Sequence, residues 1–275
     1  MHPVLLDLGF FKFYTYGAML VISFLCSTVL AVYLGKKRGY SEDAVIELCM
    51  GAILAGIIGC RVGYVVLENP QEYIAHPLRA LNFREGGMTI TGGVTLSVMY
   101  LLFISRKAKN GASVLNLLDY LGAPLLIGMA VGRFGCLLHG CCYGEISHVP
   151  WAITYPDGNL GIGIPGGPRH PSVMYEAAAD LVLMAYVLWR LPRVRFAGEV
   201  FYTVFAGYGV IRFLDEYTRH IDQYYGPLSL YQWVSVAFFV FGACGLLGVY
   251  GRKPVNTNIL PKEGEVSPLE APAVS

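Results

Sequence analysis

The chain carries little charge for its length. Only 14% of its 275 residues are charged, whereas soluble domains average about 25%. Hydrophobic residues make up 55% of the chain, and this composition predicts an integral membrane protein. The net charge of +1 gives no positive field that would attract nucleic acid, and Walker and HExxH patterns are absent. The N-terminus also lacks the basic region of a cleaved signal peptide, so we expect the first apolar stretch to be an uncleaved helix.

Seven apolar stretches are each close to the roughly 20 residues that a helix needs to cross a bilayer. They predict an all-α, polytopic membrane protein with about seven transmembrane helices. The third and sixth are rich in glycine and polar residues, so their ends are the least defined. The stretches run roughly over residues 13–35, 44–67, 87–105, 117–139, 172–191, 198–217 and 230–250.

The distribution of basic residues predicts the orientation. Twelve lysines and arginines follow the odd-numbered stretches, and five fall on the other side. Because basic residues are enriched in cytoplasmic loops, we expect the N-terminus outside and the C-terminus in the cytoplasm. We interpret residues 1–253 as one transmembrane domain with outer-side loops at 68–86 and 140–171, and residues 254–275 as a polar, disordered cytoplasmic tail.

Most of the charged residues inside these stretches fall at one depth in this topology. Ionisable residues in a membrane are costly and need partners, so one shared site is favoured over scattered pairs formed only for stability. Arginine matches phosphate geometry, and Arg212 and Glu216 are one helical turn apart. Three arginines against two glutamates leave a residual positive charge that suits an anionic lipid headgroup. The residues at this depth include Tyr16, Arg61, Arg133, Glu176, Tyr208, Arg212 and Glu216.

Two glycine pairs, Gly86-Gly87 and Gly92-Gly93, bracket a short run in the third stretch. Glycine lets a backbone approach a ligand closely. Close packing of helices through small residues explains the same pattern, and the sequence leaves both interpretations open.

Cysteine is the last unusual feature. The seven cysteines are odd in number and mostly lie in apolar stretches, so no disulfide framework is expected. Cys136, His139, Cys141 and Cys142 have ligand types that suit zinc or another thiophilic metal, but their spacing is not a standard CxxC pair. A redox pair is an alternative, although a bridge between adjacent cysteines would be strained. We expect packing at a helix end and no metal.

Five spaced segments resemble the motifs of the prolipoprotein diacylglyceryl transferase family, over about residues 10–250. Gly59-Cys-Arg-Val-Gly-Tyr64 is similar to GGRIGY, and Gly86-Gly-Met-Thr-Ile-Thr-Gly-Gly93 to GGMSFHGG. Gly132-Arg-Phe-Gly135, with Gly140 and Gly144, resembles the frame of GRxGNFxNGExxG. Residues 169–176 resemble RHPSQLYE, and residues 207–216 resemble GYGxxRxxxE.

The chain departs from these motifs at four positions. Thr91 stands where the family has a histidine that is often proposed as the general base. Cys136 and His139 replace the two asparagines of the signature, and Cys141 replaces its glutamate. Arg133 and Arg212 match the family.

The resemblance implies transfer of a diacylglyceryl group from phosphatidylglycerol to the lipobox cysteine of prolipoproteins in the bacterial inner membrane, without a cofactor. It implies catalytic roles for Arg133, Arg212 and Tyr208, and for Thr91 as the residue at the position of the family histidine. With Thr91 at the histidine position, the base is one of His139, His170, Glu176 or a thiolate of Cys136 or Cys141, and His139 is the simplest choice. Substrate contacts are expected from Tyr16, Arg61, Gly92, Gly93, Gly144, Glu176 and Glu216.

Two other functions remain open. A diverged member would keep the lipid site but act on another acceptor. A transporter or lipid-binding protein would use the arginines without chemistry, but transporters are expected to show internal repeats, and none is evident.

Overall fold

The computed structural model describes residues 4–7, 12–68, 73, 89–107, 114–155, 166–219, 224–256, 260 and 262. It divides into two compact units, which are described separately below. Unit 1 comprises residues 1–30 and 118–255, and unit 2 comprises residues 31–117 and 256–275. Helices α1 and α5 each run from one unit into the other, because the divisions fall within them.

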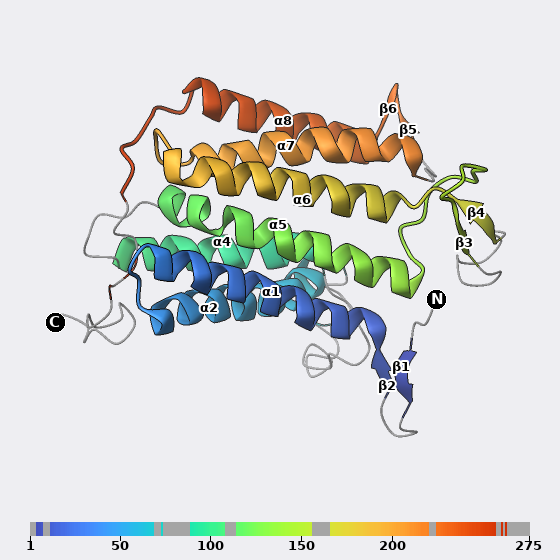
Figure 1. Cartoon of the computed structure of the whole chain (residues 1–275), viewed down its shortest axis with the longest axis horizontal. Coiled ribbons are helices and arrows are strands. Elements are labelled where there is room, and N and C mark those ends of the chain that lie inside the picture. Colours follow the sequence, from blue (N-terminus) through green and yellow to red (C-terminus); the bar gives the residue numbers. More distant parts are fainter. Residues whose placement is uncertain are drawn as a thin grey trace. The chain divides into compact units, whose positions relative to one another are not determined.

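Unit 1 is built from helices, and Figure 1 shows α5, α6, α7 and α8 side by side. The first residues of α8 form a capping box, in which Ser229 and Gln232 satisfy the free backbone N–H groups of the helix end. Gly248 ends the same helix in a left-handed conformation, with a φ of 86°. The helices are α1 (Thr15–Lys37), α5 (Val114–His139), α6 (Ser172–Arg190), α7 (Glu199–Asp215) and α8 (Leu230–Leu247), with 3-10 turns η4 (Leu191–Arg193) and η5 (Glu216–Thr218).

Three antiparallel two-stranded hairpins lie at one end of unit 1 (Figure 1). At this end α5 and α7 finish and α6 and α8 begin. The hairpins are β1 (Val4–Asp7) with β2 (Lys12–Tyr14), β3 (Ile153–Tyr155) with β4 (Gly167–Arg169), and β5 (Tyr224–Tyr225) with β6 (Leu228–Ser229).

Buried polar groups hold the opposite end of the helices in unit 1. Asp119 accepts hydrogen bonds from the backbone N–H groups of Gly198, at 2.6 Å, and Phe201, at 2.8 Å. These are free N–H groups at the start of α7, so Asp119 caps that helix from α5. Glu199 pairs with Arg190 of α6. Asp119 and Glu199 are therefore stabilised by helix capping and by ion pairing, respectively.

Unit 2 is organised around the packing of α2 (Glu42–Gly63) against α4 (Ile90–Lys107). A β-carbon at Gly92 would lie 2.2 Å from the carbonyl oxygen of Gly59 and 2.8 Å from the Cα of Gly63. A β-carbon at Gly93 would lie 2.4 Å from the sulfur of Cys60. Only glycine fits these positions, because the two backbones are in contact. Beyond α2 the chain continues as the π-helical segment η1 (Tyr64–Glu68).

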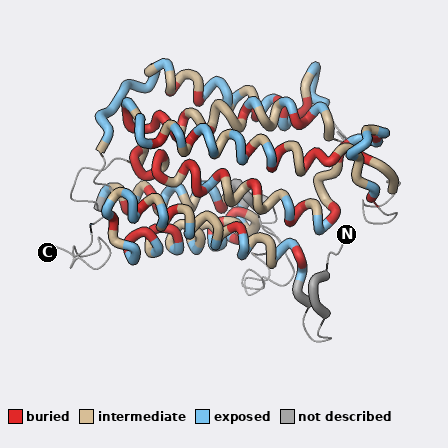
Figure 2. Tube along the Cα trace, viewed as in Figure 1, coloured by how far each residue is buried: buried red, intermediate tan, exposed pale blue. Residues whose placement is uncertain are grey.

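Each of the seven predicted stretches contains a helix of the described structure. Five helices in this part of the chain are long and apolar enough to cross a membrane, which supports a polytopic membrane protein: Thr15–Lys37, Glu42–Val66, Val114–His139, Ser172–Arg193 and Leu230–Leu247. The third and sixth predicted stretches contain helices α4 and α7. Apolar side chains such as Val29, Val182 and Leu247 point outward, as a lipid-facing surface requires, and exposed segments run along the helices in Figure 2.

Candidate functional site

The carboxylate of Glu176, in the first turns of α6, is the centre of the polar network in unit 1. Its side chain is fully buried. Arg133 of α5 pairs with Oε1, and the Tyr208 hydroxyl of α7 donates to the same oxygen at 2.9 Å. Arg219 donates to Oε2 at 2.6 Å. Three separate segments therefore converge on one buried carboxylate.

A second group of charges lies around Arg212 and is connected to the first. Arg212 pairs with Glu216 at 2.8 Å, as their helical spacing predicts, and with Asp215 at 3.4 Å. Asp215 in turn accepts a hydrogen bond from Nε of Arg219 at 2.6 Å. Arg219 therefore links Asp215 to Glu176, and the two groups form one continuous network. Ser229, at the start of α8, donates to Glu216 at 2.8 Å.

Arg219 stays protonated within this network. Burial opposes its charge, but the carboxylates of Asp215 and Glu176 outweigh that effect and raise the pKa of the guanidinium above its usual value. The network therefore holds three guanidinium groups against three carboxylates. The residual positive charge predicted from the sequence counted Arg61, which lies in unit 2, and omitted Asp215 and Arg219, so it stays a prediction.

The guanidinium groups lie at the exposed side of the network and the carboxylates lie beneath them. The side chains of Arg133 and Arg212 are 20% and 13% exposed, whereas Glu176 is 0% and Glu216 is 3% exposed. Each guanidinium has five N–H donors, and the carboxylates use only some of them. A group that approaches from the exposed side would therefore meet N–H donors, even though the network is electrically balanced.

The chain after α5 is held tightly against this network. A β-carbon at Gly144 would lie 2.5 Å from the carbonyl oxygen of Thr218 and 2.6 Å from that of His170. Arg169 is buried and donates from Nη1 to the Gly144 carbonyl at 3.1 Å, with its guanidinium over the ring of Tyr143. Gly144 is thus a point of close backbone contact among three segments, which explains why only glycine fits there.

Tyr16 and His139 lie next to each other in unit 1. Tyr16 is in the first turn of α1, and His139 is the last residue of α5. Their ring centroids are 6.1 Å apart, and both side chains are exposed. Packing of α1 on α5 at Gly135, where a β-carbon would lie 2.9 Å from Met19, brings the two rings together.

The remaining predicted residues belong to unit 2. Arg61 is buried in the last turn of α2, with its guanidinium 5.5 Å from the ring centroid of Tyr73. Gly92 and Gly93 face α2 and allow its close packing against α4. Thr91 lies in the first turn of α4, and its side chain is outside the part that the structure describes. A shared site that joins Arg61 to Arg133 stays a prediction.

Asp215 and Arg219 are members of the network that the sequence analysis did not select. Arg219 was counted only as a basic residue of an outer loop. The spacing of Asp215 and Arg219, which are four residues apart and on either side of the end of the sixth apolar stretch, is the available signal, since such residues face each other on a helical turn. The sequence contains no comparable signal for Ser229, because Ser229 is 13 residues from Glu216 and only folding brings the two side chains together.

Comparisons with known proteins identify the family. The family profile described as Prolipoprotein diacylglyceryl transferase matches residues 3–248. A phosphatidylglycerol–prolipoprotein diacylglyceryl transferase of Geobacter sulfurreducens is 33% identical over 91% of this chain and 96% of its own length. The Bordetella bronchiseptica protein of the same name is 33% identical over 92% and 96%. That of Vibrio atlanticus is 30% identical over 91% of each chain.

Two buried carboxylates on α6 offer a matched test of the network. Glu176→Gln should lower the stability of the detergent-solubilised protein by about 3–5 kcal/mol, because it leaves Arg133 without its carboxylate partner and Arg219 with Asp215 alone. The carboxylate of Asp180, one turn along the helix, is also buried but makes no hydrogen bond to any residue described. Asp180→Asn should therefore change stability by less than about 1 kcal/mol. Thermal unfolding compares the two variants, and equal losses would argue against Glu176 as the centre.

Proposed function

Because this chain belongs to the prolipoprotein diacylglyceryl transferase family, we propose that it transfers a diacylglyceryl group from phosphatidylglycerol to the lipobox cysteine of prolipoproteins. The name shared by the relatives states the group transferred, its donor and its acceptor. In this reaction the thiol sulfur forms a bond to the glycerol carbon that carries the phosphate. The carbon–oxygen bond to the phosphate breaks, so the products are a thioether and glycerol phosphate.

The observation that carries this proposal is the group of partly exposed guanidinium side chains paired with buried carboxylates. The departing glycerol phosphate gains negative charge as its bond to carbon breaks, and preorganised N–H donors stabilise such charge. We assign this role to Arg133 and Arg212, since each combines a partly exposed guanidinium with a buried carboxylate partner. The carboxylates fix the orientation of the guanidinium groups without meeting the phosphate themselves.

The other predicted residues take supporting roles in the proposal. Tyr208 donates to Glu176 and lies 3.5 Å from Nη2 of Arg133, so it fixes the position of both. Glu216 does the same for Arg212. We assign lipid or acceptor contacts, as the sequence predicts, to Tyr16, Arg61, Gly92, Gly93 and Gly144. Thr91, at the position of the family histidine, keeps its predicted place among the catalytic residues.

The acceptor thiol also has to lose its proton. At neutral pH only a few per cent of an ordinary thiol is ionised, and the thiolate is the nucleophile. We assign the role of proton acceptor to His139. This residue is the last of α5, six residues after Arg133, and its imidazole is exposed. The neighbouring ring of Tyr16 supports this position.

We further propose that the chain crosses the bacterial inner membrane seven times, with its N-terminus outside. The bacterial origin of the relatives and the bias of basic residues support this arrangement. Helix α7 is 17 residues long, or about 26 Å, which is close to the thickness of the hydrocarbon layer when the turn η5 extends it. The guanidinium network would then face the outer leaflet.

Arg133→Lys and Arg212→Lys test the phosphate role. Lysine keeps the positive charge opposite the buried glutamates but lacks the planar donor array, so each variant should fold and lose roughly 100-fold or more in kcat. The assay follows a lipobox peptide incubated with phosphatidylglycerol vesicles. Arg252→Lys is the control, because Arg252 stacks on Phe196 away from this network. Full turnover in the first two variants would refute the assigned role.

Replacement of His139 by alanine tests the proton acceptor. The same assay should show a loss of about 100-fold or more, the usual contribution of a positioned base. His148→Ala is the control, since His148 is also exposed but lies in the following loop. Unchanged turnover in the His139 variant of a folded preparation would rule out this assignment.

Reporter fusions test the topology. A fluorescent protein that folds only in the cytoplasm should fluoresce when fused after Ser275, and should stay dark when joined before Met1. Seven crossings put the two termini on opposite sides of the membrane. Fluorescence from both fusions would show an even number of crossings.

A further inference from the structure

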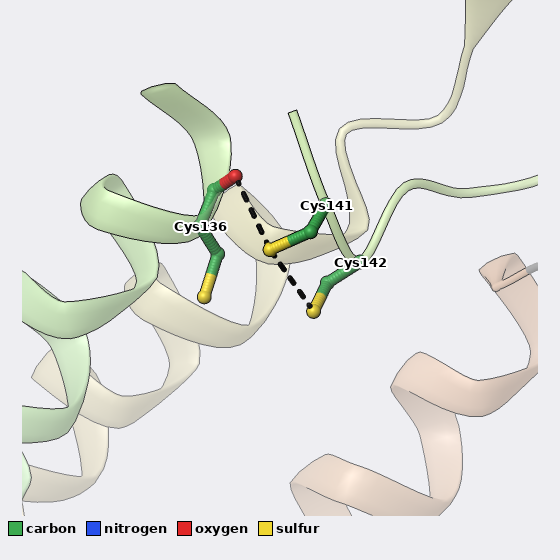
Figure 3. Close-up of side chains that lie close together, drawn as sticks. All are labelled: Cys136, Cys141 and Cys142. Atoms are coloured by element: carbon green, nitrogen blue, oxygen red, sulfur yellow. Dashed lines mark hydrogen bonds between the residues drawn. The ribbon is translucent and has the colours of Figure 1, made fainter. Parts of the chain in front are cut away.

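Three cysteine side chains meet just beyond the end of α5. Cys136 lies in the last turn of that helix, and Cys141 and Cys142 follow its end. The three sulfur atoms all lie within 4.8 Å of one another. Figure 3 shows the sulfurs of Cys141 and Cys142 turned back toward the helix that carries Cys136. We call these three residues the thiol cluster.

The backbone turn after α5 produces the thiol cluster. Gly140 has a φ of 85°, and the N–H groups of Gly140 and Cys141 both donate to the Cys136 carbonyl, at 3.0 and 3.1 Å. This turn reverses the chain, as glycine commonly allows at a helix end. Cys142 then has a φ of 60°, which is unusual for a residue with a side chain. Close contacts at Gly144 hold the next part of the chain.

The distances in the thiol cluster fit a bound metal better than a disulfide between neighbours. The sulfurs of Cys141 and Cys142 are 3.7 Å apart. Two thiolates on one tetrahedral zinc ion, each at about 2.3 Å, are separated by about 3.8 Å. A disulfide between adjacent residues would join Cα atoms about 3.8 Å apart, which is shorter than the usual range. All three cysteines are free thiols.

The thiol cluster lies close to the guanidinium groups of Arg133 and Arg219, because the charges of both act on the Cys142 thiol. Both arginines belong to the network around Glu176. The cluster thus adjoins the network proposed to bind phosphate.

We propose that Cys136, Cys141 and Cys142 bind one zinc ion whose fourth position takes the thiol of the acceptor cysteine. Three protein ligands with one open position are typical of catalytic rather than structural zinc sites. A thiol that coordinates zinc is deprotonated, so the ion supplies the nucleophile that the transfer needs. This inference rests on the proposed function, because it assigns the acceptor thiol to the metal.

The step balances without an oxidant or reductant. The acceptor thiol binds zinc through sulfur and gives its proton to His139, the acceptor assigned above. The bound sulfur then forms the bond to the glycerol carbon, while the carbon–oxygen bond breaks and its electron pair leaves with glycerol phosphate. The thioether is neutral and binds zinc more weakly than the thiolate, so the product leaves and the ion stays Zn²⁺.

The position of the thiol cluster agrees with this role. It lies in the stretch where Cys136 and Cys141 depart from the signature of the family. The chain also has Thr91 where the family has its histidine. A metal that ionises the thiol would lessen the need for a strong base at that position.

Metal content tests the binding itself. The full chain, purified with a reducing agent and incubated with Zn²⁺ before desalting, should retain about one zinc ion per chain by elemental analysis. Cys136→Ser, Cys141→Ser and Cys142→Ser should each lose it, whereas Cys244→Ser, in α8, should keep it. Cobalt in place of zinc should give strong thiolate-to-metal absorption. No retained metal, or an intact mass two hydrogens lower from a disulfide within the cluster, would overturn the proposal.

Removal of the metal from the unmodified chain tests the role in the reaction without any substitution. A chelator should lower turnover of the lipobox peptide by about 30-fold or more, because only a few per cent of a free thiol is ionised at neutral pH. Added Zn²⁺ should restore it. Full activity of the metal-free chain would refute the thiol-binding role. If the chain retains zinc but is inactive both with and without it, the proposed function and the thiol-binding role are refuted. The retained zinc would still support the metal site itself.

Discussion

The buried carboxylate of Glu176 is the constraint on which the end of unit 1 depends. A charged carboxylate inside an apolar bundle is stable only when paired, so Arg133 and Arg219 have to reach it. Arg133 comes from α5, and Arg219 follows α7, so the pairing draws the ends of three helices together. Loops and hairpins at this end then fit around the ion pairs. A requirement of stability thereby places guanidinium groups at a surface where a phosphate can meet them.

The same end of unit 1 combines two kinds of chemistry within a short stretch of chain. Arg133 offers N–H donors for an anion that leaves, and Cys136, three residues later, belongs to a group of sulfurs that suits a soft cation. Residues three apart lie on neighbouring positions of a helix face. A transfer from a phospholipid to a thiol needs both a stabilised phosphate and an ionised sulfur. The end of α5 can therefore supply groups both for the leaving phosphate and for the acceptor sulfur.

The sequence predicted the helices well, because a membrane requires long apolar runs, and all seven runs contain helices. It also predicted the pair of Arg212 and Glu216, since the spacing is local. The partner of Arg133 is 43 residues away, so only the fold identifies it. Asp215 and Arg219 were not predicted as members of the network, although their spacing of four residues is a local signal. The cysteine cluster was interpreted as packing, because its spacing is irregular and only the turn at Gly140 brings the sulfurs together.

The proposed reaction joins a diacylglyceryl group to a cysteine thiol through a thioether bond. It is tested by mass spectrometry of a lipobox peptide after incubation with the purified chain and phosphatidylglycerol vesicles. The peptide should become heavier by one diacylglyceryl group, fragments should place the group on the cysteine sulfur, and glycerol phosphate should appear in the solution. An unchanged peptide, in the presence of folded chain with bound phosphatidylglycerol, would contradict it.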